Sequence, residues 1–223
     1  MALDTKILAT VRGSYQPIFA EGSDEQPQLN TRGELLVSQG LPPLATLVNA
    51  GNSYMASTTT AAAPVVAIPT TAALIGLWNG EAANGKSYII DSIFVIQTAV
   101  TAAVQNVGIL VNVALQPVLT ALANTITPRN LRSTLGYRGM GRVAVGITLD
   151  ATNGIAANWF PVGTTPSAQN TLQIGTTVDV NVNGMFVIPP GGQIALTALA
   201  GAATATSVQI GLRWHEVVLP PAV

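Results

Sequence analysis

A chain of 223 residues is long enough for one large β domain with a sizeable buried core. Only 9% of its residues are charged, where about a quarter is usual, and the mean hydropathy is +0.45. The net charge of −1 disfavours nucleic-acid coating, and the lack of cysteine excludes disulfides, zinc-thiolate sites and thiol nucleophiles. A surface this poor in charge predicts burial against other subunits.

Residues 1–50 have the composition of an extended N-terminal arm, because turn formers recur throughout and half of the acidic residues lie there. A short strand is predicted over residues 33–38, where Glu34-Leu35-Leu36-Val37 follows a turn. Such an arm buries little surface alone, so we expect it to become ordered on a neighbouring subunit. The alternative is a partly disordered terminus.

Residues 51–223 consist of short β-branched runs separated by turns, which predicts one β domain. The predicted strands cover residues 58–68, 87–98, 106–115, 142–150, 176–181, 185–188, 193–199 and 207–218. We expect strand 87–98 to pair with strand 106–115. Asn183-Gly184 predicts a two-residue hairpin turn between antiparallel neighbours. Residues 118–123 are the one helix candidate, and the alternative for this short segment is a strand.

About eight strands without βαβ alternation favour an all-β, antiparallel jelly-roll β-sandwich over an immunoglobulin-like sandwich, which a Cys-Trp-Cys core would support. Two uncharged stretches, residues 92–128 and 180–212, are long enough to span a bilayer. Polar residues, Pro117 and Pro189-Pro190 interrupt them, so no membrane partner is expected. The first residues lack a secretion signal, which predicts cytoplasmic synthesis.

The sequence offers little chemistry for an enzyme. His215 is the one histidine, within a predicted strand where it shares a face with Arg213 and Val217, while Leu212, Trp214 and Glu216 share the other. No second histidine could complete a metal site, and no serine lies in a Gly-x-Ser-x-Gly turn. We therefore expect neither catalysis, nor a metal, nor a cofactor. The alternative, a hydrolase, would require His215 to lie in a cleft beside a serine or a carboxylate.

Charge is concentrated in one loop. Four of the nine basic residues lie between Asp91 and Asp150 without an acidic neighbour: Arg129, Arg132, Arg138 and Arg142. Arginine binds carboxylates in a two-pronged geometry. We hypothesise that this loop binds the acidic arm of an adjacent subunit, with Glu21, Asp24, Glu25 and Glu34 as candidate contacts. The alternative is a solvated loop, and contact with nucleic acid is disfavoured because Tyr137 is its one aromatic residue.

The chain has few aromatic residues. Trp78, Trp159 and Trp214 are isolated in the sequence and are expected to be core or interface anchors. The alternative is a platform for stacking carbohydrate, which would require Trp78 or Trp159 to be exposed in loops.

Three features together resemble virion proteins of tailed bacteriophages. They are a loose N-terminal segment with Gln28-Leu29-Asn30-Thr31-Arg32-Gly33-Glu34-Leu35-Leu36-Val37, a Thr/Ala/Val-rich β domain, and Ile188-Pro189-Pro190-Gly191-Gly192 followed by two strands. The chain is most similar to small jelly-roll proteins that decorate or cement heads. The resemblance implies a homotrimer on the capsid lattice, an arm that reaches neighbouring capsomers, and no catalysis.

The sequence therefore predicts a non-enzymatic virion protein, made in the host cytoplasm, whose partners are copies of itself and a major capsid or other virion protein. Many cement proteins are smaller than this chain. A major shell subunit, or a tail or fibre component that binds a receptor or glycan, is the alternative.

Overall fold

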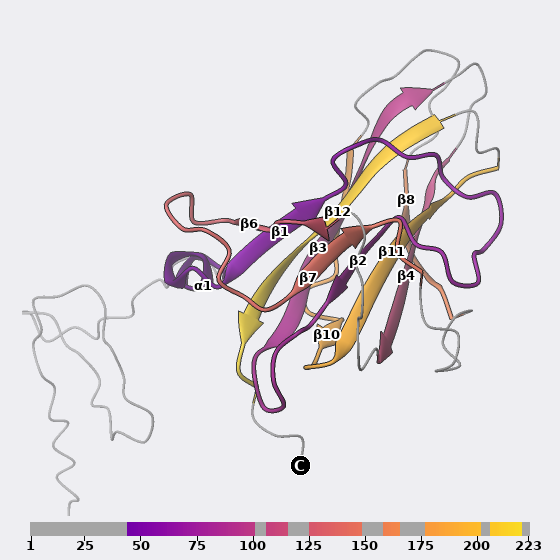
Figure 1. Ribbon diagram of the computed structural model, residues 1–223. Helices are drawn as coiled ribbons and strands as arrows, with labels where there is room; N and C mark the ends of the chain where they lie inside the picture. Colours follow the sequence, from indigo (N-terminus) through magenta and orange to yellow (C-terminus); the bar gives the residue numbers. More distant parts are fainter. Residues whose placement is uncertain are drawn as a thin grey trace, which may run out of the picture. The chain divides into compact units, whose positions relative to one another are not determined.

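The computed structural model of the protein describes residues 44–100, 106–115, 125–148, 158–165, 177–201 and 206–219. One short helix, α1 (Ala45–Ala50), precedes two six-stranded antiparallel sheets that pack face to face (Figure 1). The first sheet contains β1 (Ser53–Ser57), β3 (Ser87–Val100), β6 (Arg129–Asn130), β9 (Thr177–Asn181), β10 (Val187–Ile188) and β12 (Thr206–Val217). The second contains β2 (Ile75–Trp78), β4 (Gly108–Leu115), β5 (Thr125–Ile126), β7 (Arg142–Val145), β8 (Phe160–Thr164) and β11 (Gly192–Leu199).

The strand order identifies the fold. The first strand, β1, pairs with the last, β12. Strands further along the chain pair in the same nested way: β2 pairs with β11, β3 pairs with β9 and β10, and β4 pairs with β8. The pairs β12 with β3 and β11 with β4 then join these ribbons into the two sheets. This wrapping of an antiparallel ribbon is a jelly roll, so the predicted fold class is confirmed.

The main core lies between the sheets, where alternate side chains of both inner faces meet. Trp214, Leu212 and Ile210 of β12 point inward, whereas Arg213 points outward, as the predicted alternation of this strand requires. A second, smaller cluster packs on the outer face of the second sheet around Ala195 and Trp159. This cluster explains why β11 is buried on both faces.

Six predicted strands are confirmed to within a few residues, the strand over 142–150 has a wrong end, and the strand over 58–68 is wrong. The structure has β1 at Ser53–Ser57 in place of a strand over residues 58–68, which contains Pro64 and forms only isolated bridges. The strand predicted over 142–150 ends at Val145, because Gly146 adopts a left-handed conformation with φ of 64°.

Within the described residues, one helix and five strands were not predicted. α1 occupies the end of the segment expected to be an extended arm. The missed strands are β1, β2, β5, β6 and β8. β8 contains Pro161 and Gly163, which argue against a central strand, but β8 is an edge strand and an edge position accommodates both residues.

Two pairing predictions were wrong. β3 and β4 follow one another in the chain but lie in different sheets, because β3 pairs with β12 along nearly its whole length. The turn at Asn183-Gly184 exists, with φ of 47° and 77° and a hydrogen bond from Met185 N–H to the Val182 carbonyl. Its flanking strands do not pair with each other, because both follow the same edge of β3.

The strand predicted over residues 33–38 and the helix predicted over residues 118–123 lie outside the described residues.

Candidate functional site

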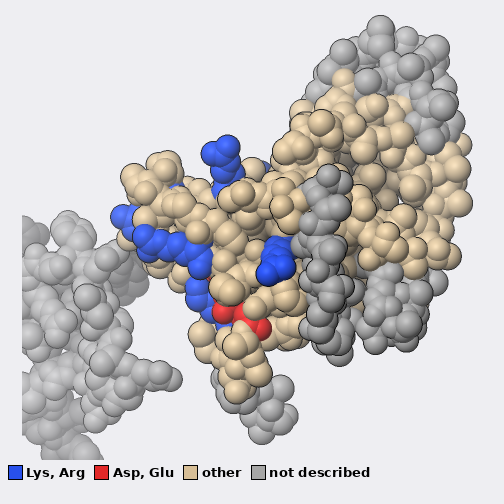
Figure 2. All heavy atoms as spheres, in the orientation of Figure 1, with Lys and Arg blue, Asp and Glu red and all other residues tan. Residues whose placement is uncertain are grey.

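The arginine-rich segment runs from β5 through β7, within the long connection between β4 and β8. β6 adds to the edge of the first sheet, and β7 with β5 adds to the same side of the second, beside β2. The segment therefore places Arg129, Arg132, Arg138 and Arg142 at one edge of the sandwich, and all four side chains are exposed. We call these four residues the arginine edge. Figure 2 shows Lys and Arg gathered at this end, while most of the remaining described surface in that view is uncharged.

Polar contacts tie this segment to the start of β1. Asn130 Nδ2 donates to the Gly51 carbonyl at 2.9 Å and to the Gly136 carbonyl at 3.3 Å. The Arg132 guanidinium donates to the carbonyl of Asn49, in the last turn of α1, where a cation also complements the helix dipole. These contacts fix the backbone of the segment.

Arg142 lies over the ring of Trp78, with its guanidinium carbon 5.8 Å from the ring centroid. The two residues face each other across the β7–β2 ladder, so sheet pairing sets this cation–π contact. Trp78 therefore supports the arginine edge.

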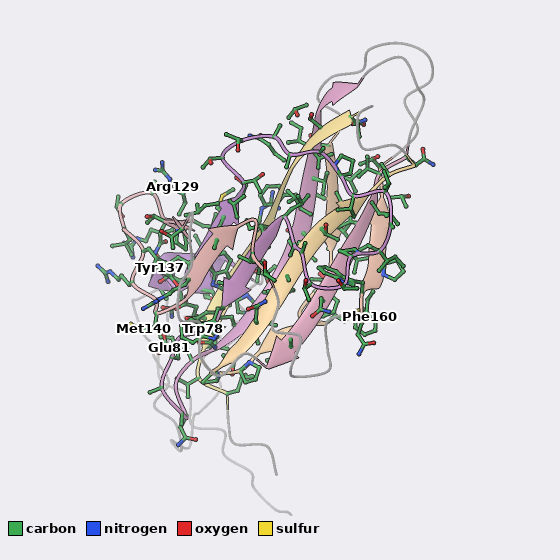
Figure 3. All side chains as sticks on the ribbon, turned by 45° about the vertical axis from the view of Figure 1, so that its right-hand side comes forward. Trp78, Glu81, Arg129, Tyr137, Met140 and Phe160 are labelled. Atoms are coloured by element: carbon green, nitrogen blue, oxygen red, sulfur yellow. The ribbon has the colours of Figure 1, made fainter. Side chains whose placement is uncertain are left out.

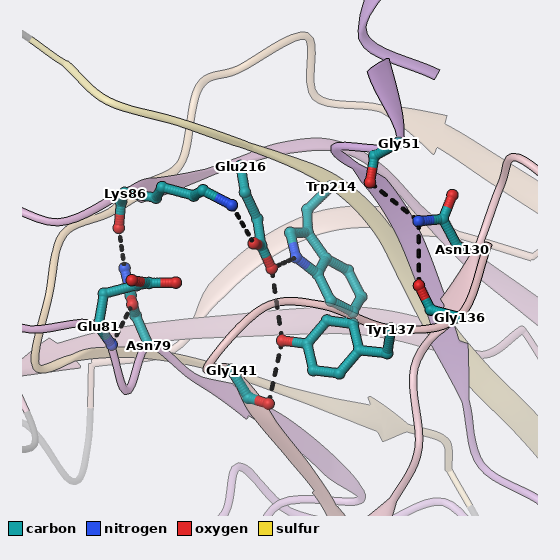
Figure 4. A network of polar contacts seen from close by, with 10 residues as sticks. All are labelled: Gly51, Asn79, Glu81, Lys86, Asn130, Gly136, Tyr137, Gly141, Trp214 and Glu216. Atoms are coloured by element: carbon teal, nitrogen blue, oxygen red, sulfur yellow. Dashed lines mark hydrogen bonds and ion pairs between the residues drawn. The ribbon is translucent and has the colours of Figure 1, made fainter. Parts of the chain in front are cut away.

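A buried carboxylate binds the segment from the core side (Figure 4). Glu216 on β12 is fully buried. Its Oε1 accepts from Trp214 Nε1 at 3.4 Å and lies 3.3 Å from the Tyr137 hydroxyl, whose hydrogen is shared with the Gly141 carbonyl at 3.0 Å. Lys86 Nζ is 3.6 Å from Oε2. Burial raises the pKa of Glu216, while the Trp214 N–H and the Lys86 ammonium oppose that rise.

Gly139 lets the segment approach this carboxylate. A Cβ at Gly139 would overlap both Glu216 carboxylate oxygens, so the backbone of the loop packs directly against the buried group. Burial also raises the pKa of Tyr137, which keeps its hydroxyl protonated as a donor.

No described acid pairs with the arginine edge. Elsewhere Arg213 forms an ion pair with Asp179, and Lys86 forms one with Glu216. Within the described parts of the chain, no ion pair joins any of the four arginines to a carboxylate. The predicted acidic contacts Glu21, Asp24, Glu25 and Glu34 lie outside the described residues, so their contact with these arginines stays a prediction.

The three tryptophans are buried or half-buried. Trp214 has no exposed surface, and Trp159 is only 8% exposed within the smaller cluster. Trp78 is half-buried beneath Arg142. The exposed position that the carbohydrate alternative requires of Trp159 is therefore wrong. Within the subunit, Trp159 and Trp214 are core residues. Phe160 follows Trp159 in the chain and is 53% exposed, and it lies far from Arg129 in Figure 3.

His215 lies on the outer face of the first sheet, with Nδ1 2.9 Å from a carboxylate oxygen of Asp91. Ser53 is its cross-strand neighbour on β1, but the Ser53 hydroxyl is buried and makes no hydrogen bond. Asp91 and His215 thus form a pair, and among the described residues no serine hydroxyl hydrogen-bonds to this histidine, as the activation of a serine nucleophile would require. Among the described residues, no cluster of three or more His, Asp or Glu side chains could hold a metal ion.

A groove of about 1290 Å³ opens beside the arginine edge. We call it the β1 groove. Residues 55–57, 59–60, 125–130, 133, 135–137 and 145 line it. Arg129 is the one charged residue of this lining, which is otherwise built from Thr, Ser, Asn, Gly and apolar side chains.

The sequence predicts that the four arginines lie together, but the contact between Tyr137 and Glu216 that fixes their segment was not predicted. Glu216 was predicted to share a face with Trp214, and that face points into the core. A carboxylate at an inward position signals a buried polar partner, which could have directed attention to Tyr137 as its donor.

Comparisons with known proteins identify no family for this chain. No family model and no curated protein matches the chain. Two virus-particle structures are similar over nearly its whole length. A full particle of Israeli acute paralysis virus, heated to 63 degrees, covers 98% of this chain and 84% of its own at 12% identity and a TM-score of 0.26. A KBV particle activated at acidic pH covers 99% and 92% at 11% identity and a TM-score of 0.25. Neither is described as a bacteriophage protein, and similarity this low carries no argument about fold or function.

No helix in the described parts of the chain is long and apolar enough to cross a membrane.

Proposed function

We propose that this protein is a non-enzymatic structural component of a virus particle that packs against copies of itself and against other virion proteins. The observation that carries the proposal is the arginine edge. Four exposed arginines without a described acidic partner lie on a segment that Tyr137 ties to the buried Glu216, and they face outward from a body with few charges. The N-terminal residues of the same chain carry five of its ten acidic residues.

This distribution suits contact between subunits. Because the contact between Tyr137 and Glu216 already fixes the backbone of this segment, little backbone conformational freedom is lost when an acidic segment binds. We propose Glu21, Asp24, Glu25 and Glu34 of an adjacent copy as the acidic partners.

Most of the adhesion should come from apolar burial, at about 25 cal/mol per Å². Exposed apolar side chains are spread over the described surface, including Phe160, Met185 and Val187 at 53%, 75% and 40% exposure. Exposed ion pairs contribute only about 0–1 kcal/mol each. The arginine contacts therefore orient subunits, while apolar contacts hold them together.

More narrowly, the proposed role is a capsid decoration or cement protein, assembled as a homotrimer in the virion after synthesis in the host cytoplasm. The jelly-roll fold and the sequence resemblance to head-decorating proteins support this role. A native mass near three copies of the 22.9 kDa chain is the expected result by native mass spectrometry. A monomer at every concentration would contradict it.

Charge reversal tests the arginine edge directly. Arg129→Glu with Arg138→Glu should weaken self-association about tenfold, because repulsion replaces attraction. Adding Asp24→Arg and Glu25→Arg to the same chain should restore it. Sedimentation of the wild type, the double variant and the quadruple variant measures both effects. An unchanged association constant in the double variant, or no rescue in the quadruple variant, would reject the acidic-segment contact.

A further inference from the structure

β1 has a paired strand along the whole of one edge but along only part of the other edge, which faces the β1 groove. On one side β12 pairs with all five residues of β1. On the other, β6 pairs only with Tyr54 and Met55. Among the described strands, none continues the ladder beside Ala56 and Ser57 on that side.

The direction of the backbone groups shows which atoms are left open. The Asn52 carbonyl accepts from Glu216 N–H of β12, and Thr58 N–H donates to the Ile210 carbonyl of the same strand. The Ser53 carbonyl instead accepts from Leu131 N–H, on the β6 side. Since these groups alternate along a strand, the N–H and C=O of Ser57 point to the β6 side, into the β1 groove.

The groove has the size and chemistry for a peptide. Its volume of about 1290 Å³ exceeds the roughly 300–1,000 Å³ of small-molecule pockets. An open strand edge with a groove beside it binds extended peptides by strand addition, in which backbone hydrogen bonds give affinity and alternate side chains enter the groove. Ile126, Leu135 and Val145 supply apolar lining, and Arg129 supplies the one charge.

The chain itself contains a matching segment. Residues 33–38 are predicted to form a strand, with three consecutive apolar residues, Leu35, Leu36 and Val37, and one acid, Glu34. Their alternation sends a leucine to each face of the strand, and Glu34 complements Arg129. Along this part of the chain the groove is lined by residues 55–57 and 59–60, and Ala56 and Ser57 are the two β1 residues there that β6 leaves unpaired.

We infer that residues 33–38 of a neighbouring copy add to β1 as an extra strand in the β1 groove. This inference rests on the proposed self-association and names one contact that carries it. The added strand covers the open edge at Ser57, which would otherwise be a site for uncontrolled pairing.

Engineered disulfides test the contact in the full-length chain, which has no cysteine of its own. Ser57→Cys is combined in turn with Leu35→Cys, Leu36→Cys and Val37→Cys, because only one register brings the two Cα atoms within disulfide distance. After mild oxidation, denaturing gels should show a band at the mass of two or more chains for one of the three pairs. The control combines each arm cysteine with Met185→Cys, which is 75% exposed and lies outside the groove.

Each outcome decides one point. A multi-chain band specific to Ser57→Cys upholds donation between copies. A cross-link within one chain overturns donation between copies. No cross-link for any pair overturns strand addition altogether. The native mass of the untreated protein is recorded in parallel, so a multi-subunit particle without cross-links rejects this inference while the proposed function stands, and a monomer rejects the function.

Blocking the backbone gives a second, independent measurement. Leu36→Pro removes an N–H and disfavours an added strand, and should weaken self-association at least fivefold by sedimentation. Gln39→Pro lies just outside the segment and serves as the matched control. Equal association constants for the two proline variants would overturn the inference.

Discussion

The two edges of the sandwich are built in opposite ways. At the arginine edge, β5, β6 and β7 extend both sheets, and Asn130, Tyr137 and Glu216 tie the added segment to the body. At the other edge, β8 ends one sheet and β9 with β10 end the other, without added strands in the described chain. That edge exposes Phe160 and Met185. Charge is thus presented on an anchored scaffold, and apolar surface on plain edge strands.

The two edges therefore differ in how many polar contacts they need to be stable. Burying Glu216 costs free energy unless donors surround it, so Tyr137 and Trp214 must hold their places. The edge with Phe160 and Met185 needs no such network, because these exposed apolar side chains require no hydrogen-bond donors. We expect mutations to affect stability strongly at the first edge and weakly at the second.

The largest effect is expected at Gly139. Gly139→Ala should lower the free energy of unfolding by about 3 kcal/mol, because the methyl group displaces the segment from the buried Glu216 carboxylate. Gly136→Ala is the matched control, since a Cβ there meets nothing within 4 Å and should change stability by less than about 1 kcal/mol. Urea unfolding measures both. Equal stability of the two variants would show that the segment does not pack against Glu216.

Removing one hydroxyl should have an intermediate effect. Tyr137→Phe leaves the ring packed against Tyr54 but removes the donor shared by Gly141 and Glu216. We expect a loss of about 1–2 kcal/mol in urea unfolding. A neutral result would mean that Trp214 and Lys86 alone satisfy the carboxylate.

The pH dependence of stability should change with Glu216. Because burial raises its pKa, the folded state holds a proton that the unfolded state has already lost once pH exceeds about 4.5. Its contribution to stability is therefore greatest at low pH and declines as pH rises toward the folded pKa. Glu216→Gln should remove that decline, so the stability difference between variant and wild type should grow in favour of Gln from pH 4 upward. Urea midpoints across that range measure it, and a constant difference would contradict the raised pKa.

The smallest effect is expected at the plain edge. Phe160→Ser with Met185→Ser should change the free energy of unfolding of the dissociated subunit by less than about 0.5 kcal/mol, because both side chains are largely in solvent. The same pair should weaken self-association if this edge is an apolar interface, as proposed. Sedimentation and urea unfolding separate the two, and a large loss of stability would mean that this edge is as tightly packed as the arginine edge.

Much of the fold could be predicted from sequence, while little of the site could. β-branched runs and turns predicted the jelly roll and most strand positions, and the arginine cluster is visible as a run without acids. The pairing of β3 with β12 could not be predicted, since partners more than a hundred residues apart leave no local pattern. The missed edge strands β5 and β6 have two residues each, too few for any periodicity.

By itself the sequence determined the all-β class, the alternation of β12 and the turn at Asn183-Gly184, because each depends on neighbouring residues alone. Tertiary structure decided which strands meet and what happens to Glu216. Its inward direction follows from the period of two, but its tolerance in the core depends on Tyr137, 79 residues away along the chain. The same long-range packing fixes four arginines at one edge and leaves β1 half covered beside them.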